Sequence, residues 1–323
     1  MSDSIIAWLL SSAEPWTRYR TLVDLLGRPQ ADAGVQAARA QMLSHPELRD
    51  LMARASHWGK QALKRHNDAA HPIYALSTLA DFGLRAEDPG MDDLISGVLA
   101  RQASEGPFQS LVSIPKAFGG SGDDTWAWMA CDSPTLLYAL LAFGLGDDER
   151  VQRAVQHLAG AVQDNGWRCL AAPELGRFRG PGRRDDPCPI ANVYALKALA
   201  LAPAYADGAA ARAGAEMLLQ HWARRKEWKP FLFGAGTDYR KLKYPYVWYD
   251  LLHVLEVLSR CHWLHGDSRF QEMVDTLRAQ ADGDGRYRAG SMYLAWKGWS
   301  FADKKAPSPW LTLLAWRILG RVA

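Results

Sequence analysis

The 323-residue sequence is poor in the features that mark several large classes of protein. Its four cysteines have no CxxC spacing, which disfavours a disulfide framework or a zinc ribbon. The formal net charge is only +3 and no long basic run occurs, so we predict that the chain does not bind nucleic acid. Neither GxxxxGK[ST] nor GxGxxG is present, and a standard nucleotide-binding loop is therefore not expected.

Long apolar runs are also missing. The first residues, MSDSIIAWLLSSAEP, contain a short apolar stretch without a cationic lead, and no segment reaches the ~20 apolar residues of a membrane span. We therefore expect a cytoplasmic chain with no signal peptide and no transmembrane segment. No Ser/Gly-rich or charge-rich linker separates two halves, so we predict that residues 1–323 form a single domain.

Six regularly spaced prolines are the main positive feature. They recur every 55 to 64 residues, at Pro15, Pro72, Pro134, Pro189, Pro245 and Pro309. Each precedes an apolar, helix-forming stretch such as PIYALSTLADFG or PTLLYALLAFG. Proline suits the first turn of a helix, where its missing N–H would have no partner. The spacing predicts a helical repeat architecture.

A second, more polar helix follows each proline-led one. In residues 149–162, apolar Val151, Val155, Leu158 and Val162 recur at helical spacing, as in an outer amphipathic helix. We predict an all-α fold, an α/α toroid of about six inner and five to six outer helices. The alternative is an open superhelix. The last inner stretch, PWLTLLAWRIL, is as apolar as the middle ones and needs cover, which favours the closed ring.

The long loops that lead into the inner helices carry the polar and aromatic side chains. All of them would lie on one rim of the toroid, where we predict the functional site. Candidate acid–base residues on this rim are Asp132, Asp186, His66, His71, Tyr249 and Asp250, with Asp68, Cys131 and Cys188 beside the substrate. Aspartates just before a proline also suit helix capping. Convergence of carboxylates, imidazoles and thiols in one aromatic pocket favours acid–base catalysis.

Basic and aromatic residues in the same loops suggest how a substrate is held. Next to helix N-termini, Arg179, Arg183, Lys241 and Lys243 could bind an anionic head group, or could simply pair with Asp185, Asp186 and Asp238. Aromatic walls would come from Trp126, Trp128, Trp248 and Trp299, which suit an apolar or carbocationic ligand. Sugar rings also stack on Trp.

Several of the polar helices end in Gln followed by Gly and an aromatic residue, as in RQASEGPF, VQDNGWRC and RAQADGDGRY. This pattern resembles the repeats of terpenoid cyclases and protein prenyltransferases, including the QW-type motif of squalene–hopene cyclases. The resemblance implies an α/α barrel with an aromatic-lined central cavity. The segment Ser121-Gly122-Asp123-Asp124-Thr125 is similar to the DxDDT motif of class II cyclases, which implies that Asp123 is a proton donor.

The zinc site of the prenyltransferases is matched only in part. Asp186-Pro187-Cys188 fits its Asp-x-Cys element, but the expected His is absent from Lys243-Tyr244-Pro245-Tyr246. Because zinc needs three or four converging ligands, we predict no metal and no cofactor.

The sequence therefore favours a terpenoid-cyclase-like enzyme that performs acid–base cyclisation, isomerisation or elimination on an apolar or isoprenoid-like substrate. One alternative is a carbohydrate-active hydrolase or lyase on an α6/α6 toroid, with two carboxylates flanking the glycosidic bond. Another is a toroid that binds a small molecule or a protein without catalysis.

Overall fold

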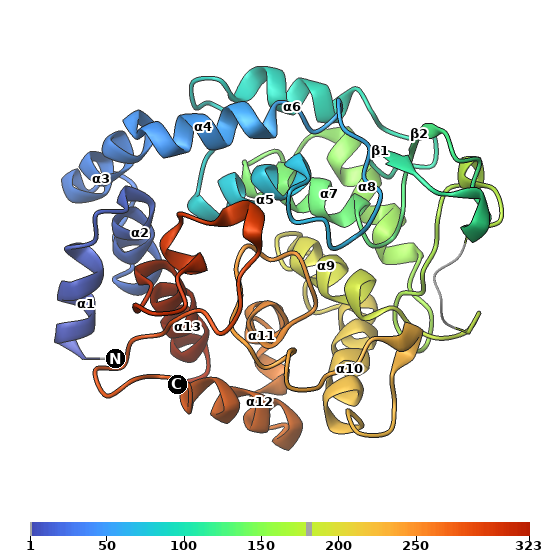
Figure 1. Ribbon diagram of the computed structural model, residues 1–323. Helices are drawn as coiled ribbons and strands as arrows, with labels where there is room; N and C mark the ends of the chain where they lie inside the picture. Colours follow the sequence, from blue (N-terminus) through green and yellow to red (C-terminus); the bar gives the residue numbers. More distant parts are fainter. Residues whose placement is uncertain (1, 179–182) are drawn as a thin grey trace. The chain divides into compact units, whose positions relative to one another are not determined.

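The computed structural model describes residues 2–178 and 183–323, and helices dominate it (Figure 1). The helix-rich content expected from the sequence is thus confirmed. The chain divides into two compact units. We call Met1–Leu51, Thr237–Tyr246 and Asp250–Ala323 the first unit, and Met52–Gly236 with Val247–Tyr249 the second unit. Closure of the helices into one ring and a single domain remain predictions.

Three proline-led helices form the inner layer of the second unit. They are α5 (Pro72–Phe82), α7 (Ser133–Ala142) and α9 (Pro189–Leu199), with α7 packed between the other two (Figure 1). Every residue of α5 and of α9 is buried, as expected of helices that are apolar nearly all round. The left-handed φ of +94° at Gly83, which ends α5, needs a residue without a Cβ.

The outer helices of this unit are amphipathic. They are α6 (Met91–Leu99), α8 (Glu149–Gly160) and α10 (Ala209–Ala223). In α8 the buried residues are Val151, Ala154, Val155 and Leu158, a stripe at helical spacing that packs towards α7 and α9. A further helix, α4 (Pro46–Ala55), contains the boundary between the two units.

A small antiparallel sheet in the loop before α7 was not expected from the sequence. Strand β1 (Ser110–Ser113) pairs with β2 (Asp124–Ala127), so that Leu111 lies opposite Trp126. The preceding segment joins this hairpin, because Leu63 N–H donates to Leu111 C=O at 2.8 Å. Short turns of 3₁₀-helix, η2 (Lys116–Phe118), η3 (Pro173–Leu175) and η4 (Pro230–Leu232), complete the loops of this unit.

The first unit contains six α-helices among its described residues: α1 (Asp3–Leu10), α2 (Pro15–Arg20), α3 (Ala33–Ser44), α11 (Leu251–Leu258), α12 (Ser268–Arg278) and α13 (Pro309–Arg321). A π-helical turn, η1 (Thr21–Leu25), continues α2. The buried α13 packs against α1, α2, η1 and α11. The loops of the first unit contain three 3₁₀ turns among the described residues: η5 (His262–Leu264), η6 (Leu294–Trp296) and η7 (Ser300–Ala302).

The prolines begin helices in five of the six repeats. Pro15, Pro72, Pro189 and Pro309 are first residues and Pro134 is a second residue. The exception is Pro245, which precedes the start of α11 at Leu251. That helix begins instead at the side chain of Asp250, whose Oδ1 accepts the N–H of His253 at 3.3 Å.

One contact recurs in both units and explains the repeated Gly–aromatic pattern. In the second unit, the Asn192 amide accepts from Trp167 N–H (3.1 Å) and donates to Trp167 C=O (2.8 Å), while Cys188 N–H donates to the same carbonyl (2.8 Å). In the first unit, Thr312 Oγ1 accepts from Tyr287 N–H (2.9 Å), and Ser308 N–H donates to Tyr287 C=O (2.8 Å). The sequence separations are identical, 25 and 21 residues, so both aromatics occupy the same repeat position.

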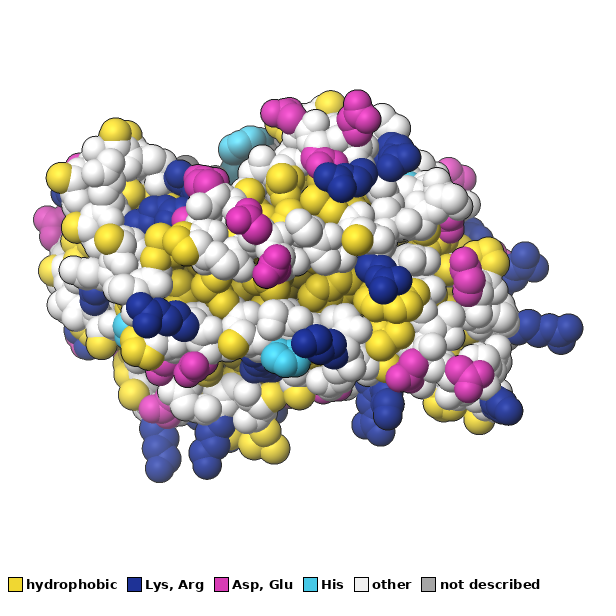
Figure 2. Space-filling model, turned by 90° about the horizontal axis from the view of Figure 1, so that it is seen from above, with side chains coloured by type: hydrophobic (Ala, Val, Ile, Leu, Met, Phe, Trp, Pro, Cys, Tyr) yellow, Lys and Arg dark blue, Asp and Glu magenta, His cyan; other side chains and the backbone are white. Residues whose placement is uncertain are grey.

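The surface carries both signs of charge. On the face shown in Figure 2, Lys and Arg side chains lie among Asp and Glu side chains, as the small net charge of +3 suggests. Among residues 2–178 and 183–323, each helix is too short or too polar to cross a lipid bilayer.

Candidate functional site

A cavity of about 710 Å³ lies in the second unit, where its long loops meet. Its walls are mainly apolar. Lining residues include Leu63, His66, Ile114, Phe118, Met129, Cys131, Cys169, Phe178, Cys188, Ile190, Phe233 and Trp248. An apolar cavity of this size with a few polar groups is typical of a small-molecule site.

His66 is held at the cavity by its neighbours in the loop before α5. The hydroxyl of Tyr74 on α5 donates a hydrogen bond to the carbonyl of His66. On one side of His66, Leu63 is fixed to the hairpin, and on the other His71 caps α5 by accepting Ile73 N–H at its Nδ1. The His66 ring is left half-buried and lines the cavity.

Cys131 and Asp132 reach the same place from the start of α7. Both side chains are buried. Asp132 occupies the N-cap position of α7, but its carboxylate makes no capping hydrogen bond. It turns instead to His66, whose Nδ1 lies 3.4 Å from Asp132 Oδ1. Helix capping, the alternative that the sequence left open, therefore does not account for this aspartate.

The three side chains form one cluster, which we call the His66 cluster (His66, Cys131 and Asp132). Cys131 Sγ lies 3.2 Å from His66 Nδ1 and 3.7 Å from Asp132 Oδ2. Thiol and carboxylate thus both face the same imidazole nitrogen. This differs from a nucleophile–base–acid relay, in which the carboxylate holds the nitrogen opposite to the one that faces the nucleophile.

The environment sets the protonation of these groups. Burial opposes a charge on His66, but the adjacent Asp132 carboxylate outweighs it, so the pKa of His66 is raised. Burial, reinforced by the Asp132 charge, raises the pKa of the Cys131 thiol well above its ordinary value, and burial raises that of Cys188 to about 12. Neutral thiols are weak nucleophiles, so the cluster suits proton transfer better than covalent catalysis.

The same three residues could hold a metal ion. One ligand atom from each lies within 4.8 Å of the others. With zinc bonds of about 2.0–2.3 Å, a tetrahedral site separates its ligand atoms by roughly 3.3–3.6 Å. Two of the observed separations are close to these values, His66 Nδ1 to Cys131 Sγ at 3.2 Å and His66 Nδ1 to Asp132 Oδ1 at 3.4 Å. The 3.7 Å contact of Cys131 Sγ is with the other carboxylate oxygen, Asp132 Oδ2. These three residues are not the zinc ligands considered in the sequence analysis, where Asp186 and Cys188 were compared with the prenyltransferase zinc site.

Among the other predicted residues of the second unit, two line the cavity and three make contacts elsewhere. Cys188 and Trp248 line its wall. His71 is fully buried and satisfied, because its Nε2 contacts Gln61 C=O at 2.9 Å in addition to its capping bond. Tyr249 donates to Gly234 C=O at 3.2 Å. Asp68 accepts Ala70 N–H at 3.1 Å, within a loop turn.

Several predicted residues of the second unit do not join the cluster. Asp123 is exposed in the β1–β2 hairpin, where its N–H donates to Ser121 Oγ. Asp186 accepts Arg183 N–H at 3.2 Å. Two tryptophans are occupied elsewhere, because Trp126 packs against Trp58 and beneath Arg101, and Trp128 donates to Glu105 at 2.6 Å. Arg179 lies outside the described residues.

The remaining predicted residues belong to the first unit. Lys241 and Lys243 both pair with Asp238, at 3.2 and 2.9 Å. Asp250 is fully buried, and Trp299 packs between Trp16 and Phe301, with ring centroids 5.2 and 5.3 Å away.

The sequence reasoning missed several residues that line the cavity. Cys169, Ile114, Phe178 and Phe233 were not singled out. For Cys169 a signal exists, because it follows the repeated Gly–Trp pair by two residues and so sits where the chain turns into its loop. The apolar residues in irregular loops have no periodicity that would mark them.

Comparisons with known proteins add little. No protein-family model matches this chain, and no curated protein matches it. A solved structure of a protein from Actinoplanes resembles it with 12% sequence identity and a TM-score of 0.32, over 85% of this chain and 99% of that one. At this level the likeness supports no conclusion about fold or function.

Proposed function

We propose that this chain is an enzyme that performs acid–base cyclisation, isomerisation or elimination on an apolar, isoprenoid-like small molecule. The observation that carries the proposal is that His66 and Cys131 line the apolar cavity while the buried Asp132 contacts His66. Protonated His66, stabilised by Asp132, would donate a proton to the substrate, and the neutral imidazole that remains would take a proton back from the cationic intermediate. The apolar walls would exclude water from a cationic intermediate.

The proposed architecture is the α/α toroid, with the terpenoid-cyclase and prenyltransferase repeats as its relatives. Supporting it are the alternating buried and amphipathic helices of the second unit and the contact repeated at Trp167 and Tyr287. The four free cysteines suit a reducing compartment, so we place the enzyme in the cytoplasm.

Deuterium incorporation provides the test. The protein is incubated in D₂O with farnesol and with farnesyl diphosphate, and the products are analysed by mass spectrometry. We expect a product that contains deuterium from the wild type, and at least a hundredfold less from His66→Ala and Asp132→Asn, because general acid–base groups contribute about 10²–10⁴-fold. Asp123→Asn is the matched control, since this exposed aspartate is the acid implied by the cyclase motif.

Two results would count against the proposal. If Asp123→Asn lost turnover while His66→Ala stayed fully active, the reaction would have to be assigned to Asp123 in the β1–β2 hairpin. Binding of both probes without any turnover would favour the non-catalytic alternative. The glycosidase alternative gains no support, because the described residues that line the cavity include no carboxylate.

A metal-dependent reaction at the same cluster is the second candidate, favoured by the proximity of one ligand atom from each residue, all within 4.8 Å of one another. Elemental analysis of the purified protein tests it. One equivalent of zinc, lost in Cys131→Ser but kept in Cys261→Ser, would support this version. Cys261 is a suitable control because it is also a buried cysteine, but in the first unit.

A further inference from the structure

The polar residues of the cavity wall come from one segment of the loop before α5. Lys64, Arg65, His66 and Asn67 line the cavity consecutively, whereas the other described lining residues are apolar or are cysteines. His66 belongs to the proposed catalytic cluster, but Lys64 and Arg65 have no part in it. The cavity therefore combines a cationic segment with apolar walls, a combination that suits an amphiphilic ligand.

The backbone of this segment is fixed at both ends. Immediately before it, Leu63 forms two backbone hydrogen bonds with β1, of 2.8 and 3.1 Å. At the other end, Asp68 N–H donates to Arg65 C=O at 3.1 Å. Lys64 and Arg65 are therefore held at the cavity wall by a backbone that is ordered without a ligand.

Neither cation is neutralised by a described carboxylate. Lys64 and Arg65 are exposed, and their side chains make no ion pair or hydrogen bond with residues 2–178 or 183–323. Asp68, in the same loop, does not line the cavity and interacts electrostatically with Arg54. Asp132 is buried and engaged in the catalytic cluster. The two cations are thus available to an anion that enters the cavity.

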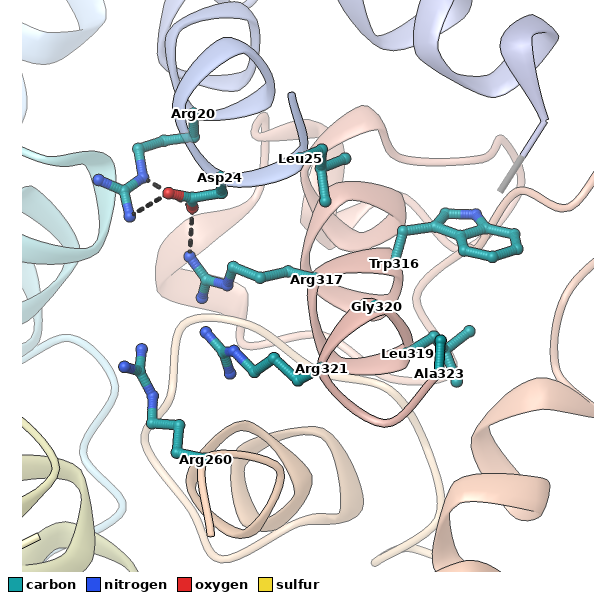
Figure 3. A pocket seen from close by; sticks show the side chains of 10 residues that line it. All are labelled: Arg20, Asp24, Leu25, Arg260, Trp316, Arg317, Leu319, Gly320, Arg321 and Ala323. Atoms are coloured by element: carbon teal, nitrogen blue, oxygen red, sulfur yellow. Dashed lines mark hydrogen bonds and ion pairs between the residues drawn. The ribbon is translucent and has the colours of Figure 1, made fainter. Parts of the chain in front are cut away.

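A pocket of the first unit shows the opposite arrangement, in which the chain supplies the anions itself. In this pocket, drawn in Figure 3, Asp24 pairs with Arg20 and with Arg317, each at 2.9 Å. The buried Glu256 pairs with Arg260 at 2.8 Å and with Arg317 at 3.1 Å. Cations that serve the packing of this protein are paired in this way, whereas Lys64 and Arg65 are not.

We infer that the cavity takes an amphiphile with an apolar chain and one oxyanionic head group, a carboxylate or a phosphate monoester, which Lys64 and Arg65 bind. This inference rests on the proposed function, because it specifies the substrate of the same cavity. The guanidinium of Arg65 can donate two parallel hydrogen bonds to such a head group, and the ammonium of Lys64 adds a second charge-assisted contact. The chain would lie along the apolar walls, which include Phe118, a residue 68% exposed.

A diphosphate is a less suitable head group. Enzymes commonly hold such groups through Mg²⁺, which is bound in turn by one or two carboxylates of the protein. The described residues that line the cavity include no carboxylate that could coordinate this ion.

Calorimetric titration at pH 8 with decanoate, decyl phosphate and decanol tests the inference. The three probes share one saturated chain, which has no double bond to protonate, so that binding is measured without turnover. We expect at least one of the two anions to bind about tenfold more tightly than decanol, and the comparison between them identifies the head group. Lys64→Gln and Arg65→Gln should each reduce this preference by about threefold or more and leave decanol binding unchanged, because a charge-assisted contact is lost.

Two further variants serve as controls. Lys60→Gln removes the same charge from an exposed lysine of this unit that does not line the cavity, and it should keep the full preference for the anion. Phe118→Ser should weaken the binding of all three probes to a similar extent, because it removes apolar contact with the chain rather than with the head group. Far-UV circular dichroism checks that each variant is folded.

Decanol bound as tightly as both anions would overturn the inference, but would leave the cavity as a site for an apolar substrate. An undiminished preference for the anion in folded Lys64→Gln and Arg65→Gln would also overturn it. A preference that depends on both cations, together with no deuterium incorporation in the test described above, would support the inference and count against the proposed catalysis.

Discussion

Replacement of the buried carboxyl of Asp250 by an amide should stabilise the protein, and increasingly so as the pH rises. Asp250 is fully buried at the start of α11, and its Oδ2 has no hydrogen-bond partner among the described residues. Burial raises its pKa from 3.8 to about 7, although Lys243 partly offsets this. Asn cannot ionise, but its carbonyl can still accept the N–H of His253.

The size of the effect follows from the two pKa values. Below pH 4, Asp250 is protonated in the folded and unfolded states alike. Between pH 4 and pH 7 the unfolded chain loses this proton while the folded chain keeps it, so the free energy of unfolding falls. A shift of about three units corresponds to about 4 kcal/mol, lost in full above pH 7.

Urea unfolding followed by circular dichroism at pH 4.5, 6, 7.5 and 9 measures this difference. Relative to the wild type, Asp250→Asn should gain about 3 kcal/mol between pH 4.5 and pH 9, because part of the effect already lies below pH 4.5. Asp267→Asn is the matched control, because Asp267 also caps a helix of the first unit but its hydrogen bonds to Arg269 lower its pKa. That variant should lose stability at neutral pH. A pH-independent difference for Asp250→Asn would refute the reasoning.

Three further substitutions probe the packing, each measured as the free energy of unfolding in urea. Lys197→Met should cost about 3–5 kcal/mol, because it leaves the buried Asp81 carboxylate without the cation 3.0 Å away; if Asp81→Leu in the same chain restores nothing, the ion pair is not the cause. Gly214→Ala should cost about 1–3 kcal/mol, since its Cβ would lie 2.5 Å from the buried Trp167 ring, and a neutral result would show that the ring can move. Ser308→Ala removes the side-chain cap of α13 and should cost about 1 kcal/mol; an unchanged midpoint would contradict this role.

Helix positions could be predicted from the sequence because they depend on local rules. Proline at a first turn and an apolar stretch behind it located the first residues of α5 and α9 correctly. The same rule failed at Pro245, where the capping side chain of Asp250, rather than proline, determines the start of α11. A proline and a capping aspartate can each mark the start of a helix, and the sequence alone does not show which of the two does so here.

The candidate site was harder to predict, because its members are brought together by loops. His66, Cys131 and Asp132 were all among the candidate residues, but so were Asp123 and Asp186, which lie elsewhere. His66 lies 65 residues before Cys131 in the sequence, and only the fold of the loop before α5 brings the two side chains together. One ion-pair cluster of the first unit did leave a sequence signal: Asp24, Glu256 and Arg317 are charged residues within proline-led stretches, and both carboxylates pair with Arg317.

The contact made by Trp167 fixes the two ends of a long loop. Trp167 and Cys188 are joined by a backbone hydrogen bond, so the twenty residues between them form a loop that is closed at its base. Tyr287 and Ser308 close a loop of the same length in the other unit. Because the closing hydrogen bond joins the two ends of each loop, we expect that residues within the loop can change while the ends stay in place.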